Sequence, residues 1–153
     1  MIEKAHISDP PEMLAIINRY ATQQLMLARS LNDVYDTLRD FFVCREDGRV
    51  LGVVALHIGW QGLGEVRSLA VLEEAQRRGI GRRLVETCLE EARQLGMKRV
   101  FVLTRLPQFF EKFGFVQCPK ESLPHKVWAD CLNCPRFPDC DEVALIKDLE
   151  SEA

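Results

Sequence analysis

The sequence contains no apolar run approaching the roughly 20 residues that a membrane-spanning helix needs, so we expect no such helix. Its first residues carry charges and reach Pro10 and Pro11 before any long apolar stretch, which is not the pattern of a signal peptide. Internal repeats and low-complexity segments are also absent. The formal net charge is −3 and no basic tail is present, so nucleic acid is not an expected partner. These absences favour a cytoplasmic globular protein that binds neither membranes nor nucleic acid.

Hydrophobic residues make up 47% of the 153 positions and charged residues 28%, which is ordinary for a globular protein. We therefore expect one domain over 1–150 with a single hydrophobic core. Six cysteines would suit disulfides in a small secreted protein, but Cys44 and Cys88 fall within apolar segments, where small buried thiols are common. Reduced cysteines in a cytoplasmic enzyme are the favoured interpretation.

Residues 65–96 form the most informative stretch of the chain. Residues 65–71 alternate well enough to predict a strand. Beyond Gly79 the apolar residues recur at steps of three and four, which is the spacing of one helix face. These residues are Ile80, Leu84, Val85, Cys88, Leu89 and Ala92. Gly96 stands where the C-terminal cap of such a helix is expected.

The segment QRRGIG, residues 76–81, joins the predicted strand to the predicted helix. Gly79 and Gly81 let the backbone approach a ligand closely, and the free N–H groups of a first helical turn attract anions. Four arginines surround this turn in a chain of negative net charge, so the positive charge is local. They are Arg77, Arg78, Arg82 and Arg83. The pattern favours a phosphate site, with an arginine-rich solvated helix face as the alternative.

This segment resembles the Q/R-x-x-G-x-G/A loop of the GNAT acetyltransferase superfamily, whose backbone amides bind the pyrophosphate of acetyl-CoA. Residues 69–71 resemble the fourth strand of that family, and FFEKFGF at 109–115 resembles its later aromatic-x-x-x-G-F signature. The resemblance implies acetyl-CoA as co-substrate. The implied cofactor-binding residues are Leu69, Ala70, Val71, Gln76, Arg77, Arg78, Gly79, Ile80, Gly81, Arg82, Thr104 and Phe110. For Thr104, a capping role before Pro107 is the alternative.

The order of predicted elements also matches this family. Strands are expected at 2–7, 41–45, 50–58, 65–71, 98–103, 115–117 and 143–146, and helices from Asp9, from Ser30, from Gly79 and at 106–113. Asp9 and Glu12 have the spacing of a capping box, and Asp47-Gly48 predicts a hairpin turn. The second helix should direct its apolar residues toward the core; these are Leu31, Val34, Tyr35 and Leu38. The order predicts a single α+β domain with a mixed central sheet and helices on both faces.

Acetyl transfer needs a neutral amine, and neutralising a lysine-like ammonium at pH 7 costs roughly 4–5 kcal/mol unless a base takes the proton. The resemblance implies Glu65 as this general base, acting through water; a surface glutamate at a strand start is the alternative. It also implies that a backbone N–H near Val71 polarises the thioester carbonyl. Phe110 stands where many members have a tyrosine that protonates the leaving thiolate, and the chain's two tyrosines, 20 and 35, lie elsewhere in the sequence.

A closer resemblance is to the acetyltransferase domain of N-acetylglutamate synthases, the first enzymes of arginine biosynthesis. It is carried by residues 27–30, 65–71, 101–104, 109–115 and 123–128. These residues include no counterpart of the amino-acid-kinase domain of classical members, as in short stand-alone bacterial forms. The resemblance implies that the chain is an acyltransferase acting on the α-amine of L-glutamate. Another small amine or a protein amine, or a non-catalytic acyl-CoA sensor, is the alternative.

A glutamate substrate presents two carboxylates, which planar arginine side chains match well. Arg29 occupies the position where the resemblance implies a carboxylate ligand. Arg67 lies two residues from Glu65 on the predicted strand and hence on the same face. Lys126 is a weaker third substrate-binding residue. The alternative for each is a solvated surface charge.

A cysteine-rich loop at 118–141 departs most from the family pattern. Cys131 and Cys134 have the spacing of zinc ligands. Cys140 would add a third thiolate, and either Cys118 or His125 would complete a tetrahedral site. Because no second paired motif accompanies them, we assign no metal ligand; a structural zinc, a disulfide or redox role, and reduced thiols all stay open. The oligomeric state, including a homodimer, also stays open.

Overall fold

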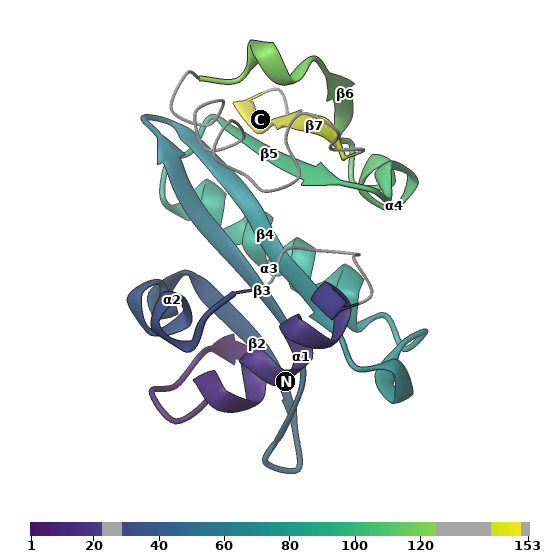
Figure 1. Ribbon diagram of the computed structural model, residues 1–153. Helices are drawn as coiled ribbons and strands as arrows, with labels where there is room; N and C mark the ends of the chain where they lie inside the picture. The colour runs from purple at the N-terminus through teal and green to yellow at the C-terminus, as the bar shows by residue number, and fades with distance from the viewer. Residues whose placement is uncertain (23–28, 125–141, 151–153) are drawn as a thin grey trace. The chain divides into compact units, whose positions relative to one another are not determined.

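The computed structural model describes residues 1–22, 29–124 and 142–150 (Figure 1). The chain forms two compact units, one of Met1–Leu56 with Val66–Glu91 and the other of His57–Glu65 with Ala92–Ala153. Seven strands follow the order β1-β2-β3-β4-β5-β7-β6. Neighbours β4 and β5 are joined through helix α3, the connection that parallel strands need, so the sheet is mixed as predicted.

Strands β1 (Ile2–Lys4), β2 (Phe41–Glu46) and β3 (Arg49–Trp60) of the first unit pair antiparallel. The predicted hairpin turn is confirmed, because Asp47 and Gly48 both have positive φ, of 54° and 75°. The strand expected over 2–7 ends early. The N–H of Asp9 donates to the carbonyl of His6 at 2.9 Å, which closes a turn before the first helix.

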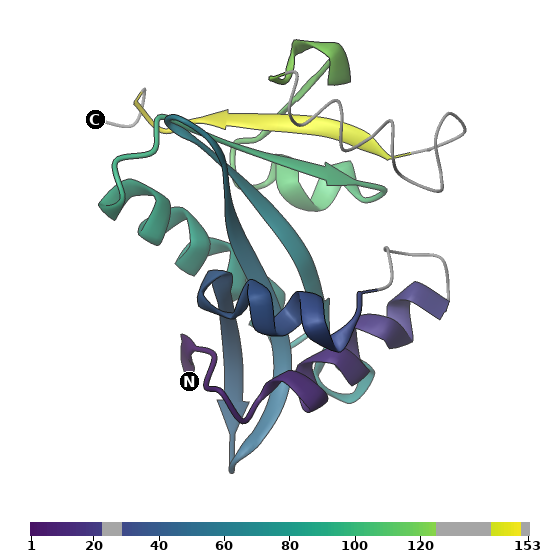
Figure 2. The ribbon, with the colours of Figure 1, turned by 60° about the vertical axis from the view of Figure 1, so that its left-hand side comes forward.

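Helices cover both faces of these strands in the first unit, as Figure 2 shows. Val53 and Ala55 of β3 join the core cluster that α1 (Pro10–Thr22) and α2 (Leu31–Asp36) cover. Gly52, on the alternate face, contacts α3 (Ile80–Gln94). A Cβ at Gly52 would lie 3.2 Å from side-chain atoms of both Ile80 and Leu84. Glycine at this position therefore allows α3 to pack closely on β3.

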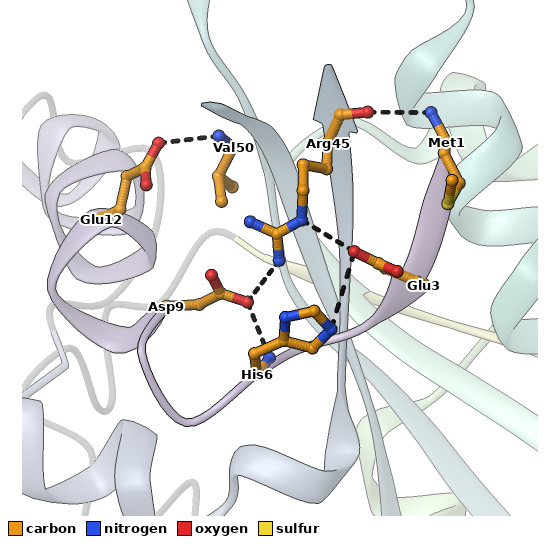
Figure 3. Close-up of polar contacts among 7 residues, drawn as sticks. All are labelled: Met1, Glu3, His6, Asp9, Glu12, Arg45 and Val50. Atoms are coloured by element: carbon orange, nitrogen blue, oxygen red, sulfur yellow. Dashed lines mark hydrogen bonds and ion pairs between the residues drawn. The ribbon is translucent and has the colours of Figure 1, made fainter. Parts of the chain in front are cut away.

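Helix α1 begins where the sequence predicts, but the predicted capping box does not form. Glu12 accepts a hydrogen bond from the Val50 N–H at 2.7 Å, and the Asp9 carboxylate accepts from the His6 N–H at 2.7 Å. Both carboxylates thus bond outside the helix (Figure 3). Pro10 and Pro11 lack the N–H groups of the first turn, which reduces the number of donors needing a cap.

Helix α2 begins at the predicted cap, where the Ser30 hydroxyl accepts from the Asp33 N–H at 3.1 Å. Only Val34 of this helix is fully buried. The prediction that Leu31 and Tyr35 also point into the core is wrong, because their exposed fractions are 40% and 41%. The helix has only six residues and buries a narrower face than its apolar pattern indicated.

A partly buried ion network, which we call the Arg45 network, consists of Glu3, Asp9 and Arg45 (Figure 3). Arg45 Nε lies 2.7 Å from Glu3 Oε1, and Arg45 Nη2 lies 2.7 Å from Asp9 Oδ2. The Asp9 side chain is 5% exposed. Burial raises the pKa of this carboxyl, but hydrogen bonds from Arg45 and the His6 N–H outweigh burial, so the pKa falls below 3.8.

Strand β4 (Leu63–Val71) leads into α3, whose end is the predicted glycine cap. Gly96 has a φ of 81°. The N–H of Gly96 donates to the Arg93 carbonyl at 3.0 Å, and the N–H of Met97 donates to the Ala92 carbonyl at 2.9 Å. This pair of bonds is the Schellman motif.

The second unit holds β5 (Arg99–Thr104), α4 (Pro107–Glu111), β6 (Val116–Cys118) and β7 (Val143–Asp148). The expected last strand is confirmed, and β7 pairs antiparallel with both β5 and β6. Its core cluster contains Leu63, Phe101, Leu123 and Ala144. Helix α4 is shorter than the predicted 106–113. None of the helices in the described part of the chain is long and apolar enough to cross a membrane.

Candidate functional site: the phosphate loop and strand β4

The phosphate loop, residues 76–81, has the backbone geometry of an anion site. The first backbone bond of α3 runs from the Arg83 N–H to the Gly79 carbonyl at 3.1 Å, so the N–H groups of the preceding residues have no intrahelical acceptor. These residues are Ile80, Gly81 and Arg82. Gly79 has a φ of 79°, and a Cβ there would meet nothing within 4 Å. No acidic residue lies in the first turn of α3. The loop therefore presents amides and open space, which fit a pyrophosphate.

The four arginines of this region differ in their partners. Arg78 Nη2 lies 2.6 Å from Glu46 Oε2, and Arg82 Nε lies 2.9 Å from Glu86 Oε1. Among the described residues, the side chains of Arg77 and Arg83 have no hydrogen-bond or ion-pair partner. All four side chains are exposed. Exposed ion pairs contribute little, so an incoming phosphate can compete for Arg78 and Arg82.

Strand β4 is irregular where the acetyl group is expected. Ser68 has a φ of 57°, which is rare for a residue other than glycine and is found at functional sites more often than elsewhere. Leu69 and Val71 are partly exposed, whereas Ala70 between them is buried. The carbonyl of Val71 accepts hydrogen bonds from the Tyr20 hydroxyl and, at 3.2 Å, from Gln76 Nε2.

Arg29 is fastened beside this irregular part of β4. Its Nη1 donates to the Ser68 hydroxyl and its Nη2 to the Thr37 hydroxyl, both at 3.1 Å. The guanidinium lies 5.5 Å from the centre of the Phe41 ring. The Asn18 amide holds the Arg29 main chain, accepting from its N–H at 3.1 Å and donating to its carbonyl at 3.3 Å. The fold thus places the Arg29 guanidinium against Ser68, the residue that follows Arg67 on β4.

The predicted residues of the second unit have different environments. Glu65 is 7% exposed, so the alternative of a surface glutamate is wrong. The Thr104 hydroxyl accepts from the Leu106 N–H at 2.9 Å in the turn before α4, but the N-cap of α4 is Leu106 and no side chain caps the helix, so Thr104 does not have the capping role. Phe110 is 4% exposed and packs edge-on against Phe109 and Phe115, with ring centres 5.1 and 5.7 Å away. This packing makes Phe110 a core residue. Lys126 lies outside the described residues.

The described part of the chain contains no group of three or more histidine, cysteine, aspartate or glutamate side chains that could hold a metal ion. Cys44, Cys88 and Cys118 are free thiols. Burial raises the pKa of the Cys88 thiol to about 12, so this thiol is unreactive at neutral pH. The other cysteines of the predicted zinc candidates, and His125, lie outside the described residues.

Sequence patterns did not identify three residues of this site. Asn18 and Tyr20 belong to α1, where helical spacing predicted only their secondary structure. Ser68 is a polar residue in a predicted strand, which carried no signal of left-handed backbone. Their roles depend on partners far along the chain: Tyr20 and Val71 are 51 positions apart, and Arg29 and Ser68 are 39 apart.

Comparison with known proteins agrees with this geometry. The family model for the acetyltransferase (GNAT) family matches residues 8–115. An uncharacterised N-acetyltransferase of Chlorobaculum tepidum is 40% identical over 148 residues, covering 97% of this chain and 96% of that protein. An amino-acid acetyltransferase of Mycobacterium tuberculosis is 35% identical over 120 residues, covering 76% of this chain and 68% of that protein.

A solved structure extends the comparison. It is that of N-acetylglutamate synthase from Neisseria gonorrhoeae complexed with coenzyme A and N-acetyl-glutamate, which is 28% identical with a TM-score of 0.89. The match covers 97% of this chain and 35% of that one. The α+β fold, the loop between β4 and α3, and the family match over most of the chain lead to one conclusion. The protein belongs to the GNAT acetyltransferase family.

Proposed function

We propose that the protein transfers the acetyl group of acetyl-CoA to the α-amine of L-glutamate. This proposal depends on the observed position of the Arg29 guanidinium. Ser68, Thr37 and the Phe41 ring hold it beside β4. A guanidinium fixed in this way suits a carboxylate of the acceptor. Arg67, on β4, is proposed to bind the second carboxylate, and Lys126 to assist.

Acetyl-CoA binding is proposed to use the phosphate loop and the end of β4. The amides of the first turn of α3 receive the pyrophosphate, and Arg77 and Arg82 add positive charge. Leu69 and Val71, two of the partly exposed residues of β4, contact the acetyl and pantetheine groups. Arg78 contributes its charge to the pyrophosphate only when its ion pair with Glu46 opens. The solved complex of the N-acetylglutamate synthase with coenzyme A supports this assignment.

Glu65 is proposed as the general base of the reaction. Its carboxylate takes one proton from the glutamate ammonium, directly or through water. The neutral amine then attacks the thioester carbon, a C–N bond forms and the C–S bond breaks. After the attack the nitrogen gives its second proton to water, and the CoA thiolate takes a proton from water, because Phe110 has no hydroxyl to donate; these two transfers cancel. Glu65 then returns its proton to solvent. The products are N-acetylglutamate, CoA thiol and one proton released to solvent.

The first experiment measures CoA thiol release from acetyl-CoA with each standard amino acid and with a lysine-containing peptide. We expect turnover with L-glutamate alone. Turnover with the peptide or with another amine would show that glutamate is not the acceptor, and the protein would still be an N-acetyltransferase. If acetyl-CoA binds and no acceptor reacts, the protein is a sensor and the proposed activity is wrong.

Variants of Arg29 and Glu65 test the assigned roles. Arg29→Ala should raise the KM for glutamate about tenfold or more and leave the KM for acetyl-CoA unchanged, because a charge-assisted hydrogen bond is lost. Arg93→Ala, at an exposed position in the last turn of α3, is the matched control and should change neither value.

Glu65→Gln should lower kcat about a hundredfold and remove the acidic limb of the pH profile. A profile superimposable on that of the wild type would exclude Glu65 as the base.

A further inference from the structure

Tyr20 connects three elements that the proposed function brings to one site. It lies in the last part of α1, and its ring packs partly buried against the first unit's core. Its hydroxyl donates to the Val71 carbonyl at the end of β4. The same hydroxyl accepts from Gln76 Nε2, the first residue of the phosphate loop. Because Gln76 Nε2 also donates to the Val71 carbonyl, the three groups form a closed triangle.

This triangle fixes the start of the phosphate loop relative to the end of β4. The Val71 carbonyl accepts two donors, and the Gln76 amide is held by two acceptors. Without the hydroxyl, the Gln76 side chain keeps a single acceptor and the first loop residue gains rotational freedom. A ligand that contacts both the strand and the loop must then order the loop as it binds, which costs affinity.

The hydroxyl is suited to a structural hydrogen bond. Burial raises the pKa of Tyr20, and the charge of Glu73 raises it further, against a lowering by the hydrogen bond from Gln76. The group therefore stays protonated at neutral pH and remains a donor to Val71. Phenylalanine at position 20 would retain the packing of the ring and remove only the hydroxyl.

We propose that Tyr20 is a positioning residue for acetyl-CoA, holding the phosphate loop and the end of β4 in the arrangement that binds the cofactor. The proposal rests on the proposed function, in which Val71 and the phosphate loop that begins at Gln76 contact the cofactor. Tyr20 acts through these two residues and does not exchange a proton with the substrate. Loss of the Tyr20 hydroxyl should therefore lower the affinity for acetyl-CoA and should not change the affinity for the acceptor or the pH profile.

The test measures the Kd for acetyl-CoA of Tyr20→Phe by titration calorimetry in the absence of any acceptor. We expect a rise of about fivefold to tenfold, the range set by one lost hydrogen bond and the ordering of the loop. The KM for the acceptor and the pH profile should not change. Tyr35→Phe is the matched control, because the Tyr35 hydroxyl makes no hydrogen bond to any described residue, and its Kd should equal that of the wild type.

A double-variant cycle tests whether the effect passes through the triangle. Gln76→Met should raise the Kd by a similar factor, and Tyr20→Phe combined with Gln76→Met should add little to either single change. Fully additive effects would overturn the proposal, as would an unchanged Kd in Tyr20→Phe. A shift of the pH profile would make Tyr20 a proton donor and overturn it as well. Wild-type protein that fails to bind acetyl-CoA would instead refute the proposed function itself.

Discussion

Arg45 and the arginines of the phosphate loop belong to the same compact unit, yet their surroundings differ. Arg45 contacts two carboxylates at 2.7 Å, and its side chain is 21% exposed. Arg77 is exposed, adopts a φ of 67°, and has no side-chain partner among the described residues. The Asp9 carboxylate is buried and would be costly to leave without a cation, so Arg45 serves the fold. An exposed cation beside free amides is available to a ligand.

The largest effect should come from changing the phosphate loop itself. Gly79→Asp places a negative charge where the pyrophosphate is expected and should lower acetyl-CoA affinity on the order of a hundredfold. Gly48→Asp is the matched control, because Gly48 also has a positive φ, of 75°, and open space around its Cβ position. Both variants share the backbone strain, so their melting temperatures should fall alike. Equal acetyl-CoA affinities in the two variants would refute the phosphate loop as the cofactor site.

The second effect concerns stability and comes from the Arg45 network. Arg45→Met leaves the buried Asp9 carboxylate without its cation and should lower the free energy of unfolding by about 2–4 kcal/mol. Denaturant titration measures this loss. Adding Asp9→Asn should restore part of the stability, because the uncompensated charge is removed. Acetyl-CoA affinity should stay the same, and a loss of affinity in the folded variant would contradict the separation between the two groups of arginines.

The pH dependence of stability should report on Asp9. Its folded-state pKa lies below 3.8, so ionised Asp9 stabilises the protein above 3.8 and this contribution is lost as the pH falls through the folded pKa. The difference in unfolding free energy between the wild type and Asp9→Asn should therefore shrink as the pH falls from about 5 to about 2. A constant difference for Asp9→Asn would mean that the network does not depend on this charge.

The smallest effect should distinguish the arginines within the phosphate loop. Arg77→Gln should weaken acetyl-CoA binding about twofold to fivefold at low salt, since an exposed charge near a helix start contributes little. Arg78→Gln should weaken it less, because Arg78 is already paired with Glu46. Calorimetric titration at two salt concentrations measures both. A larger loss for Arg78→Gln would show that its pair with Glu46 opens when the cofactor binds.

Features that depend on neighbouring residues were predicted well. The hairpin turn at Asp47-Gly48 and the glycine cap at Gly96 were both expected, because positive φ is a local requirement. Gly79, in the predicted phosphate loop, also has a positive φ, of 79°. The predicted capping box at Asp9 and Glu12 failed because Arg45 and the Val50 N–H, both distant in sequence, compete for the two carboxylates.

The sequence alone determined the α+β class, the order of the elements and the loop that leads into α3, because periodicity and glycine placement act over a few residues. Tertiary structure decided which charges are buried and which are exposed. It placed Arg29 beside Ser68, and it joined Tyr20 to Val71 and Gln76. These contacts link positions far apart in the chain, and side chains meet across such separations only after the helices pack on the sheet.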